Sequence, residues 1–281
     1  MPLFKPSIAA LKQKRDVAGL AGALKSKDRQ TRRDALKALA DLEARAAVPA
    51  LIELLLVEDG DLQTKVDVAE LLRKLADGSA VPALLKANAV SQERERARIK
   101  AAIASSDHRY RDGLYVNLIS AEETTLRSSI AAALGEIGGC EGLRALFEQL
   151  ASETGPMERN TKDAIKMAIV NALGKNDPGA TQVMCDLLKH ESPEIRGWAA
   201  HCLGEAGDPS SQAALLRIAC DDQQPFSVRQ YAIASLGQIG DERAIPDLEN
   251  LSVMPNRVLA RDARQSAELI RQRRPKSPAL W

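Results

Sequence analysis

The chain has 281 residues, enough for two ordinary domains or one elongated array, and its 39 Lys and Arg residues are balanced by 38 Asp and Glu residues. This balance argues against a protein whose whole surface binds nucleic acid or anionic lipid, because phosphate binding requires a concentration of cations. Aromatic residues make up only 3% of the chain, which favours packed helices over a β-sandwich rich in β-branched and aromatic side chains.

The sequence has no apolar run of the roughly 20 residues that a membrane helix needs, and its first residues lack the pattern of a signal peptide. The cysteines form no CxxC pair, which argues against a zinc site and against a disulfide framework. They are Cys140, Cys185, Cys202 and Cys220. We therefore expect a cytoplasmic protein without a metal site.

Residues 1–15 are predicted to form an N-terminal cap, because the first unit of an array needs a cover for its outer face. Eight two-helix units follow, beginning near residues 16, 47, 80, 112, 141, 179, 211 and 244. In three units a proline marks the first turn of the first helix, where its missing N–H group has no consequence: Pro49, Pro82 and Pro246. The second helices of the first seven units carry a basic residue: Arg32, Lys65, Arg98, Arg127, Lys166, Arg196 and Arg229.

The clearest copies of the repeat are residues 195–208 and 228–241, which align along their whole length at a separation of 33 residues. Apolar residues at helical spacing predict a buried stripe on each second helix. Three glycines stand where a helix would end in a left-handed conformation: Gly138, Gly207 and Gly240. The aspartates after two of them, Asp208 and Asp241, can cap the next helix or form a turn.

This pattern resembles the HEAT-repeat family, and within it the phycobilisome-lyase HEAT-like repeats, over residues from about 16 to about 273. The resemblance implies an all-α, right-handed α-α superhelix of about eight helical hairpins. We expect a single solenoid over residues 1–274, in which residues 244–274 form the C-terminal capping repeat, and a frayed tail at residues 275–281. The repeat is specific for a fold and poorly specific for a function.

Two units depart from the pattern. The second helix of the third unit, in residues 92–105, is highly charged and lacks the Gly-Asp end, so we expect a longer or tilted helix there. The fifth unit has an insertion near residues 152–160, where Gly155 and Pro156 predict an extended turn. This turn is either a tolerated surface insertion or a loop that contacts a partner.

In HEAT-repeat proteins the second helices usually line the concave face. Trp198 and Tyr231 both stand two residues after the basic residue of their helix and would lie in stacked register there. Polar or flexible residues share this predicted face: His201, Glu205, Gln230, Gln238, Met167 and Asn171. Rigid aromatic side chains beside hydrogen-bonding groups are typical of binding surfaces. The alternative is that the aromatic rings only pack against the neighbouring helix.

Four of the basic residues, Arg32, Arg127, Arg196 and Arg229, are predicted to be structural. Acidic residues precede them in the turns, at Asp28, Glu122 or Glu123, Glu191, and Asp221 or Asp222. A ladder of carboxylate–arginine contacts and arginine–carbonyl hydrogen bonds would tie the repeats together.

The sequence shows no catalytic constellation, and we expect no cofactor. It has three histidines and a single His-Glu pair, at His190 and Glu191, whereas the HEAT-like di-iron enzyme deoxyhypusine hydroxylase uses several such pairs. Cys185 or Cys202 could act with His201, but Cys202 stands on the buried stripe, where inert packing is expected.

Three functions are compatible with these features. The first is a non-catalytic scaffold or adaptor that binds a protein or peptide on the concave face. The second, which only the family resemblance supports, is a bilin lyase or a tetrapyrrole chaperone. The third is weak binding of nucleic acid or an acidic partner through the basic segment at residues 257–276, whose cations would otherwise simply suit the end of a capping helix.

Overall fold

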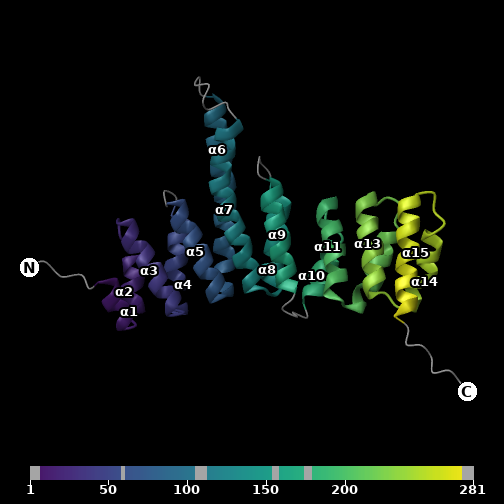
Figure 1. The fold of residues 1–281 in the computed structure, drawn as a ribbon, viewed down its shortest axis with the longest axis horizontal. Coiled ribbons are helices and arrows are strands. Elements are labelled where there is room, and N and C mark those ends of the chain that lie inside the picture. Colours follow the sequence, from purple (N-terminus) through teal and green to yellow (C-terminus); the bar gives the residue numbers. More distant parts are fainter. Residues whose placement is uncertain (1–6, 58–60, 105–112, 154–157, 174–178, 274–281) are drawn as a thin grey trace, which may run out of the picture. The chain divides into compact units, whose positions relative to one another are not determined.

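The computed structural model describes residues 7–57, 61–104, 113–153, 158–173 and 179–273. Within these ranges the chain is built from α-helices and short 3-10 turns, and it has no strand. The helices form two compact units, Met1–Ala172 and Leu173–Trp281 (Figure 1). Each unit is a set of helical hairpins packed side by side, as in an α-solenoid. The all-α solenoid fold class predicted from the sequence is therefore confirmed.

The first unit contains nine of the described helices: α1 (Ile8–Gln13), α2 (Val17–Ala23), α3 (Arg29–Asp41), α4 (Val48–Leu56), α5 (Leu62–Leu75), α6 (Val81–Ala104), α7 (Gly113–Ile137), α8 (Gly139–Ser152) and α9 (Glu158–Leu173). The second unit contains α10 (Ala180–Leu187), α11 (Pro193–Ala206), α12 (Gln212–Cys220), α13 (Phe226–Ile239), α14 (Ile245–Leu251) and α15 (Arg257–Gln272).

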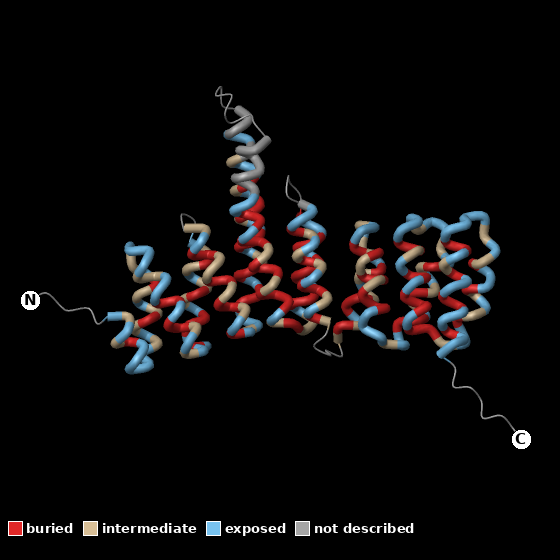
Figure 2. The backbone as a smooth tube through the Cα atoms, in the orientation of Figure 1, coloured by how far each residue is buried: buried red, intermediate tan, exposed pale blue. Residues whose placement is uncertain are grey.

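Each unit has two layers of helices. In the first unit the second helices α3, α5 and α7 pack in a row, and the first helices α4, α6 and α8 form the other row. In the second unit α11, α13 and α15 form one row, and each packs against its hairpin partner α10, α12 or α14. Buried residues gather on the helix sides that face these neighbours (Figure 2), as the apolar stripe in the sequence predicts.

The helix starts follow the sequence signals. Pro49 and Pro246 stand in the first turns of α4 and α14, where proline is tolerated. The Asp208 carboxylate accepts a hydrogen bond from the Ser210 N–H group, and Asp241 accepts one from the Arg243 N–H group. Of the two roles predicted for these aspartates, a helix cap or a turn, both residues cap the next helical segment.

The predicted glycine caps hold only in part. Gly207 ends α11 with φ 71° and ψ 12°, which is the left-handed conformation. Gly240 has φ −62°, so the left-handed prediction is wrong there. Its small size serves packing instead, because an added Cβ atom would lie 2.5 Å from the Leu236 carbonyl oxygen and 2.9 Å from Ile270 Cδ1. Gly138 has a positive φ of 68° but an extended ψ of −155°, and it precedes α8 rather than forming a left-handed cap.

The prediction of separate hairpins in the third and fourth units is wrong. Helix α6 has 24 residues and runs from Val81 to Ala104 without a break, and α7 has 25 residues. Four predicted helices are thus two long ones, which pack against each other and extend beyond the shorter helices of the first unit (Figure 1). The physical reason is that the sequence has no glycine or proline from residue 83 to Ala104. The longer helix expected at residues 92–105 is confirmed as far as Ala104.

The chain ends and the insertion are described only in part. Helix α1 packs against α2 and α3 and buries Leu11, whereas residues 1–6 of the predicted cap lie outside the described ranges. Helix α8 ends at Ser152 and α9 begins at Glu158. Residues 154–157 of the predicted insertion and the predicted tail at 275–281 also lie outside the described ranges. The single solenoid over residues 1–274 stays a prediction. None of the helices described combines the length and the apolar character needed to cross a membrane.

Candidate interaction surface

Three rings predicted to share a binding face form a cluster in the second unit. The centroids of the Trp198 and His201 rings on α11 lie 4.8 Å apart, and the His201 ring lies 5.7 Å from that of Tyr231 on α13. We call these three residues the aromatic cluster. Gly197 makes room for it, because a Cβ atom at this position would lie 3.1 Å from the Tyr231 ring. Tyr231 is 40% exposed, so the cluster is open to solvent at this ring.

The polar residues predicted beside the rings bond to one another across neighbouring helices. Gln230 Nε2 donates a hydrogen bond to Asp262 Oδ2 on α15 over 2.8 Å. Gln238 Nε2 donates one to Glu205 Oε1 on α11 over 3.1 Å. The structure places the six predicted positions of α11 and α13 in three sets: the three rings contact one another, Gln238 bonds to Glu205, and Gln230 bonds to α15. It also adds Asp262, which the sequence reading missed because α15 has no aromatic residue to mark the same register.

Close approach of the second helices holds this face in place. The Ser235 hydroxyl on α13 donates to the Ala200 carbonyl on α11 over 2.8 Å, and the Ser266 hydroxyl on α15 donates to the Ile233 carbonyl over 2.8 Å. Gly204 faces Ser235, whose Oγ atom would lie 2.6 Å from a Cβ atom added to the glycine. Such contacts leave little room for the helices to slide, so the rings are carried on a rigid support.

Met167 and Asn171 lie on α9, which belongs to the first unit. Both are exposed, and the Met167 side chain is 62% exposed. The predicted binding set is thus divided between the two units, and the aromatic cluster with its polar neighbours forms the part that the second unit carries.

Comparison with known proteins identifies the repeat. A family model of HEAT repeats matches residues 157–226 and 181–268, and a model of the PBS lyase HEAT-like repeat matches residues 31–56. The chain therefore contains HEAT repeats in these two regions. A comparison with curated proteins found no significant match.

Solved structures with a similar arrangement share little sequence with this chain. Human deoxyhypusine hydroxylase in complex with glycerol is 14% identical, with a TM-score of 0.38, over 94% of this chain and 88% of the other. The CpcE–CpcF complex of phycocyanin lyase from Nostoc sp. PCC7120 is 17% identical, with a TM-score of 0.38, over 90% and 94%. A structure concerned with microtubule plus-end tracking by XMAP215, CLIP-170 and EB1 is 16% identical, with a TM-score of 0.39, over 89% and 90%.

Two of the predicted structural arginines clamp the turn of their own HEAT hairpin. Arg32 Nη1 donates to the carbonyls of Ser26 and Lys27 over 3.0 and 3.1 Å. Arg196 Nη1 donates in the same way to the carbonyls of His190 and Glu191 over 2.7 and 2.8 Å. The turn therefore offers backbone oxygens to the guanidinium, while carboxylates predicted for this role act elsewhere. One of them, Asp28, accepts from the Thr31 N–H group at the start of α3.

The other two arginines bond differently. Arg229 Nε donates to the Ala219 carbonyl over 3.0 Å, and its Nη2 contacts Met254 Sδ in the next hairpin. Arg127 lies in a buried charged cluster, 2.9 Å from Glu95 and 3.1 Å from Glu153. Glu123, which the sequence places near Arg127, instead accepts a hydrogen bond from Ser91 over 2.7 Å.

The repeat pattern did not predict Glu95 and Glu153 as partners of Arg127. Glu95 lies on α6 and Glu153 directly follows α8, so neither belongs to the turn before Arg127. The available signal was the charged run at residues 93–98 within a stretch that has no glycine or proline from residue 83 to Ala104. Burial raises the pKa of the Glu153 carboxyl, which Arg127 only partly offsets.

The cysteines that the sequence reading considered for catalysis are poor nucleophiles. Burial raises the pKa of the Cys202 thiol far above its ordinary value of 9.0, and burial also raises the pKa of Cys185. The reactive thiolate is therefore disfavoured at both positions. Among the residues that the structure describes, no group of three or more His, Cys, Asp or Glu side chains is arranged to hold a metal ion.

The basic residues of α15 are largely engaged within the protein. Arg271 forms an ion pair with Glu249, and Arg264 Nη2 donates to the Ser252 carbonyl over 2.9 Å. Arg273 Nη2 donates to the carbonyls of Gly237 and Gly240 over 2.8 and 3.0 Å, at the end of α13. Arg273 thus binds the end of α13, whereas the sequence-based alternative placed the cations at the C-terminus of the capping helix itself.

Proposed function

We propose that this protein is a non-catalytic scaffold that binds a protein partner through the aromatic cluster on α11 and α13. The observation that carries the proposal is the contact of three rings from two neighbouring helices at the surface, with Tyr231 40% exposed. Tyr and Trp are enriched among the residues that contribute most to protein–protein binding, because they bring a large contact area with few rotatable bonds.

The surroundings of the cluster support a binding role. Small residues and serine hydroxyls hold together the helices that carry the rings. The conformational entropy lost by the ring side chains when a partner binds is therefore small. The same helices and α15 carry paired amides and carboxylates, Gln230 with Asp262 and Gln238 with Glu205. An apolar centre surrounded by a polar rim is the common arrangement of protein interfaces. The raised thiol pKa values of Cys185 and Cys202 support a non-catalytic role.

The test compares three purified variants. Tyr231→Ala and Trp198→Ala remove rings of the cluster. Phe226→Ala is the matched control, since Phe226 is 43% exposed on the same helix and does not belong to the cluster. A candidate partner is first captured from the source cells with the wild-type protein and then purified, so that its affinity for each variant can be measured.

We expect each cluster variant to weaken binding about 10-fold or more, the control to bind as the wild type does, and all three to melt as folded proteins. A partner whose affinity is the same for Tyr231→Ala, Trp198→Ala and the wild type would refute this assignment of the surface.

A further inference from the structure

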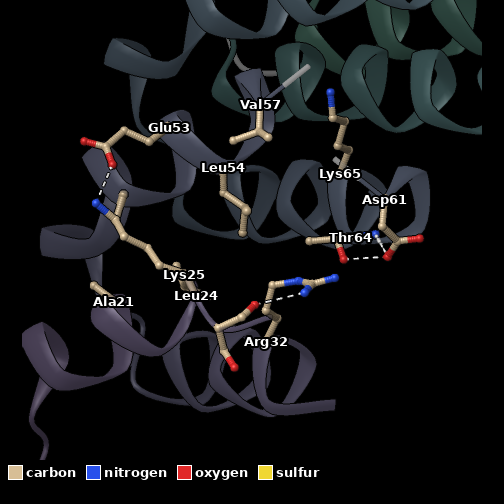
Figure 3. Close-up of a pocket in the computed structure, with 12 residues that line it drawn as sticks. Ala21, Leu24, Lys25, Arg32, Glu53, Leu54, Val57, Asp61, Thr64 and Lys65 are labelled. Atoms are coloured by element: carbon tan, nitrogen blue, oxygen red, sulfur yellow. Dashed lines mark hydrogen bonds and ion pairs between the residues drawn. The ribbon is translucent and has the colours of Figure 1, made fainter. Parts of the chain in front are cut away.

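A cavity of about 580 Å³ lies between the first two HEAT hairpins, among α2, α3, α4 and α5. Figure 3 shows Leu54 and Val57 above Arg32, with the Lys25–Glu53 ion pair on one side and Asp61 with Thr64 on the other. Cavities of this size are typical of sites for small molecules, particularly where an apolar wall meets a few polar groups. This site is separate from the aromatic cluster and does not depend on it.

One edge of the Arg32 guanidinium is available in this cavity. Its Nη1 atom donates to two carbonyls of the preceding turn. Within the described part of the chain, its Nε and Nη2 atoms have no hydrogen-bond acceptor. These two N–H groups point in the same direction and form the fork that binds both oxygens of a carboxylate.

The equivalent arginine in the second unit shows what this fork takes. Arg196 makes the same two contacts with turn carbonyls, and its Nε also donates to Gln224 Oε1 over 2.9 Å. Gln224 stands five residues before Arg229, the basic residue of the following hairpin. Among the described residues of the first unit, no side chain supplies the corresponding acceptor to Nε of Arg32, whose guanidinium bonds only to the two turn carbonyls.

The acidic groups of the cavity are already paired. Glu53 lies 3.0 Å from Lys25 Nζ, and Asp61 Oδ2 accepts from Thr64 Oγ1 over 2.7 Å and lies 3.2 Å from Arg29 Nε. The open fork of Arg32 is thus a positively charged donor next to an apolar wall. A ligand that complements both features carries one anionic group and an apolar body.

We propose that the cavity binds an amphipathic monocarboxylate. The carboxylate accepts from Nε and Nη2 of Arg32, and the apolar body lies against Leu24, Leu54 and Val57. The proposed ligand is a free acid with a short alkyl chain. The C-terminus of a peptide also carries a carboxylate and is the alternative that the experiment distinguishes.

The experiment is calorimetric titration of the full chain with octanoate and with octanol. We expect saturable one-to-one binding of octanoate and at least about 10-fold weaker binding of octanol. Ala50→Phe, which fills the cavity, and Arg32→Lys, which replaces the fork by a single point charge, should each weaken octanoate about 10-fold or more. Arg196→Lys is the matched control, and it should leave octanoate binding unchanged.

Any of three results overturns the proposal. They are a Kd for octanoate above about 1 mM, octanoate binding that Ala50→Phe does not weaken, and octanol binding as tight as that of octanoate. Ala50→Phe keeps Arg32 and its turn contacts, so it tests the site even if Arg32→Lys unfolds. A short apolar peptide with a free C-terminus, compared with its amidated form, separates the sources. Tighter binding of the free-terminus peptide than of octanoate would identify a chain end as the occupant and overturn the assignment to a free acid.

Discussion

Replacing Arg127 with methionine should strongly destabilise the first unit, because it leaves two carboxylates buried without their cation. The Arg127 side chain is 1% exposed, and those of Glu95 and Glu153, at 2.9 and 3.1 Å, are 3% and 0% exposed. Removing one partner from a buried ion pair destabilises a protein by about 3–5 kcal/mol. Methionine retains most of the apolar volume, so this loss comes mainly from the charges rather than from an empty space.

The destabilisation of Arg127→Met should also depend on pH. Burial already holds the pKa of Glu153 above 4.5, and Arg127 is the largest influence that lowers it. Without Arg127 the folded-state pKa rises further, so the folded protein binds more protons than the unfolded chain between the two values. The free energy of unfolding of the variant should therefore increase as the pH falls from about 7 to 5, in the range where protonation neutralises the buried carboxyl.

Urea unfolding followed by circular dichroism measures both effects. Arg33→Met is the matched control, because Arg33 is 52% exposed and lies 3.7 Å from Asp67, and exposed pairs contribute about 0–1 kcal/mol. Combining Arg127→Met with Glu95→Gln and Glu153→Gln should restore part of the loss, since no buried charge then lacks a partner. A loss below about 1 kcal/mol for Arg127→Met, or no recovery in the triple variant, would refute this reasoning.

The remaining predictions concern packing, a helix end and acid stability. Gly204→Ala should destabilise the second unit by about 1–3 kcal/mol in thermal unfolding, because an added Cβ atom would lie 2.6 Å from Ser235 Oγ. The control Gly22→Ala should be neutral or stabilising, since a Cβ atom there has nothing within 4 Å. Equal effects of the two substitutions would count against close packing at Gly204. Arg273→Ala should cost about 1 kcal/mol in urea unfolding by releasing the carbonyls at the end of α13, and an unchanged midpoint would exclude this cap. Hydrogen bonds from Ser210 and Thr181 hold the pKa of Asp208 below 3.8, so the contribution of Asp208 to the free energy of unfolding is present above pH 3.8 and is lost as the pH falls through the folded-state pKa. The stability of Asp208→Asn should therefore depend less on pH below about pH 4. A pH dependence equal to that of the wild type would contradict this prediction.

Local sequence signals predicted the parts of the fold that depend on local chemistry. Pro49 and Asp208 mark segment starts because proline fits a first turn and aspartate accepts from free N–H groups. The 33-residue separation of Trp198 and Tyr231 placed them in the same register of adjacent helices, since each repeat adds one hairpin of nearly constant length.

Other features depended on spatial neighbours and could not be read from the pattern. The sequence pattern predicts a left-handed cap at Gly240, yet its φ is −62°, and the close approach of the Leu236 carbonyl oxygen and Ile270 leaves no room for a side chain there. Repeat spacing suggested two hairpins in residues 80–137, but the chain contains no helix-breaking residue where the first of them would have to turn. The partners of Arg127 come from α6 and from the end of α8, so only the folded arrangement reveals them.

The contacts of Arg32 and Arg196 have a consequence for how such arrays change when hairpins are duplicated or exchanged. Each arginine binds carbonyls of its own hairpin, so this half of its environment is inherited with the module. The acceptor for Arg196 Nε comes from the hairpin that follows it. Exchange of the hairpin that follows an unchanged arginine can thus create or close a pocket in a single step. The following hairpin then determines which ligand the arginine of the preceding hairpin can bind.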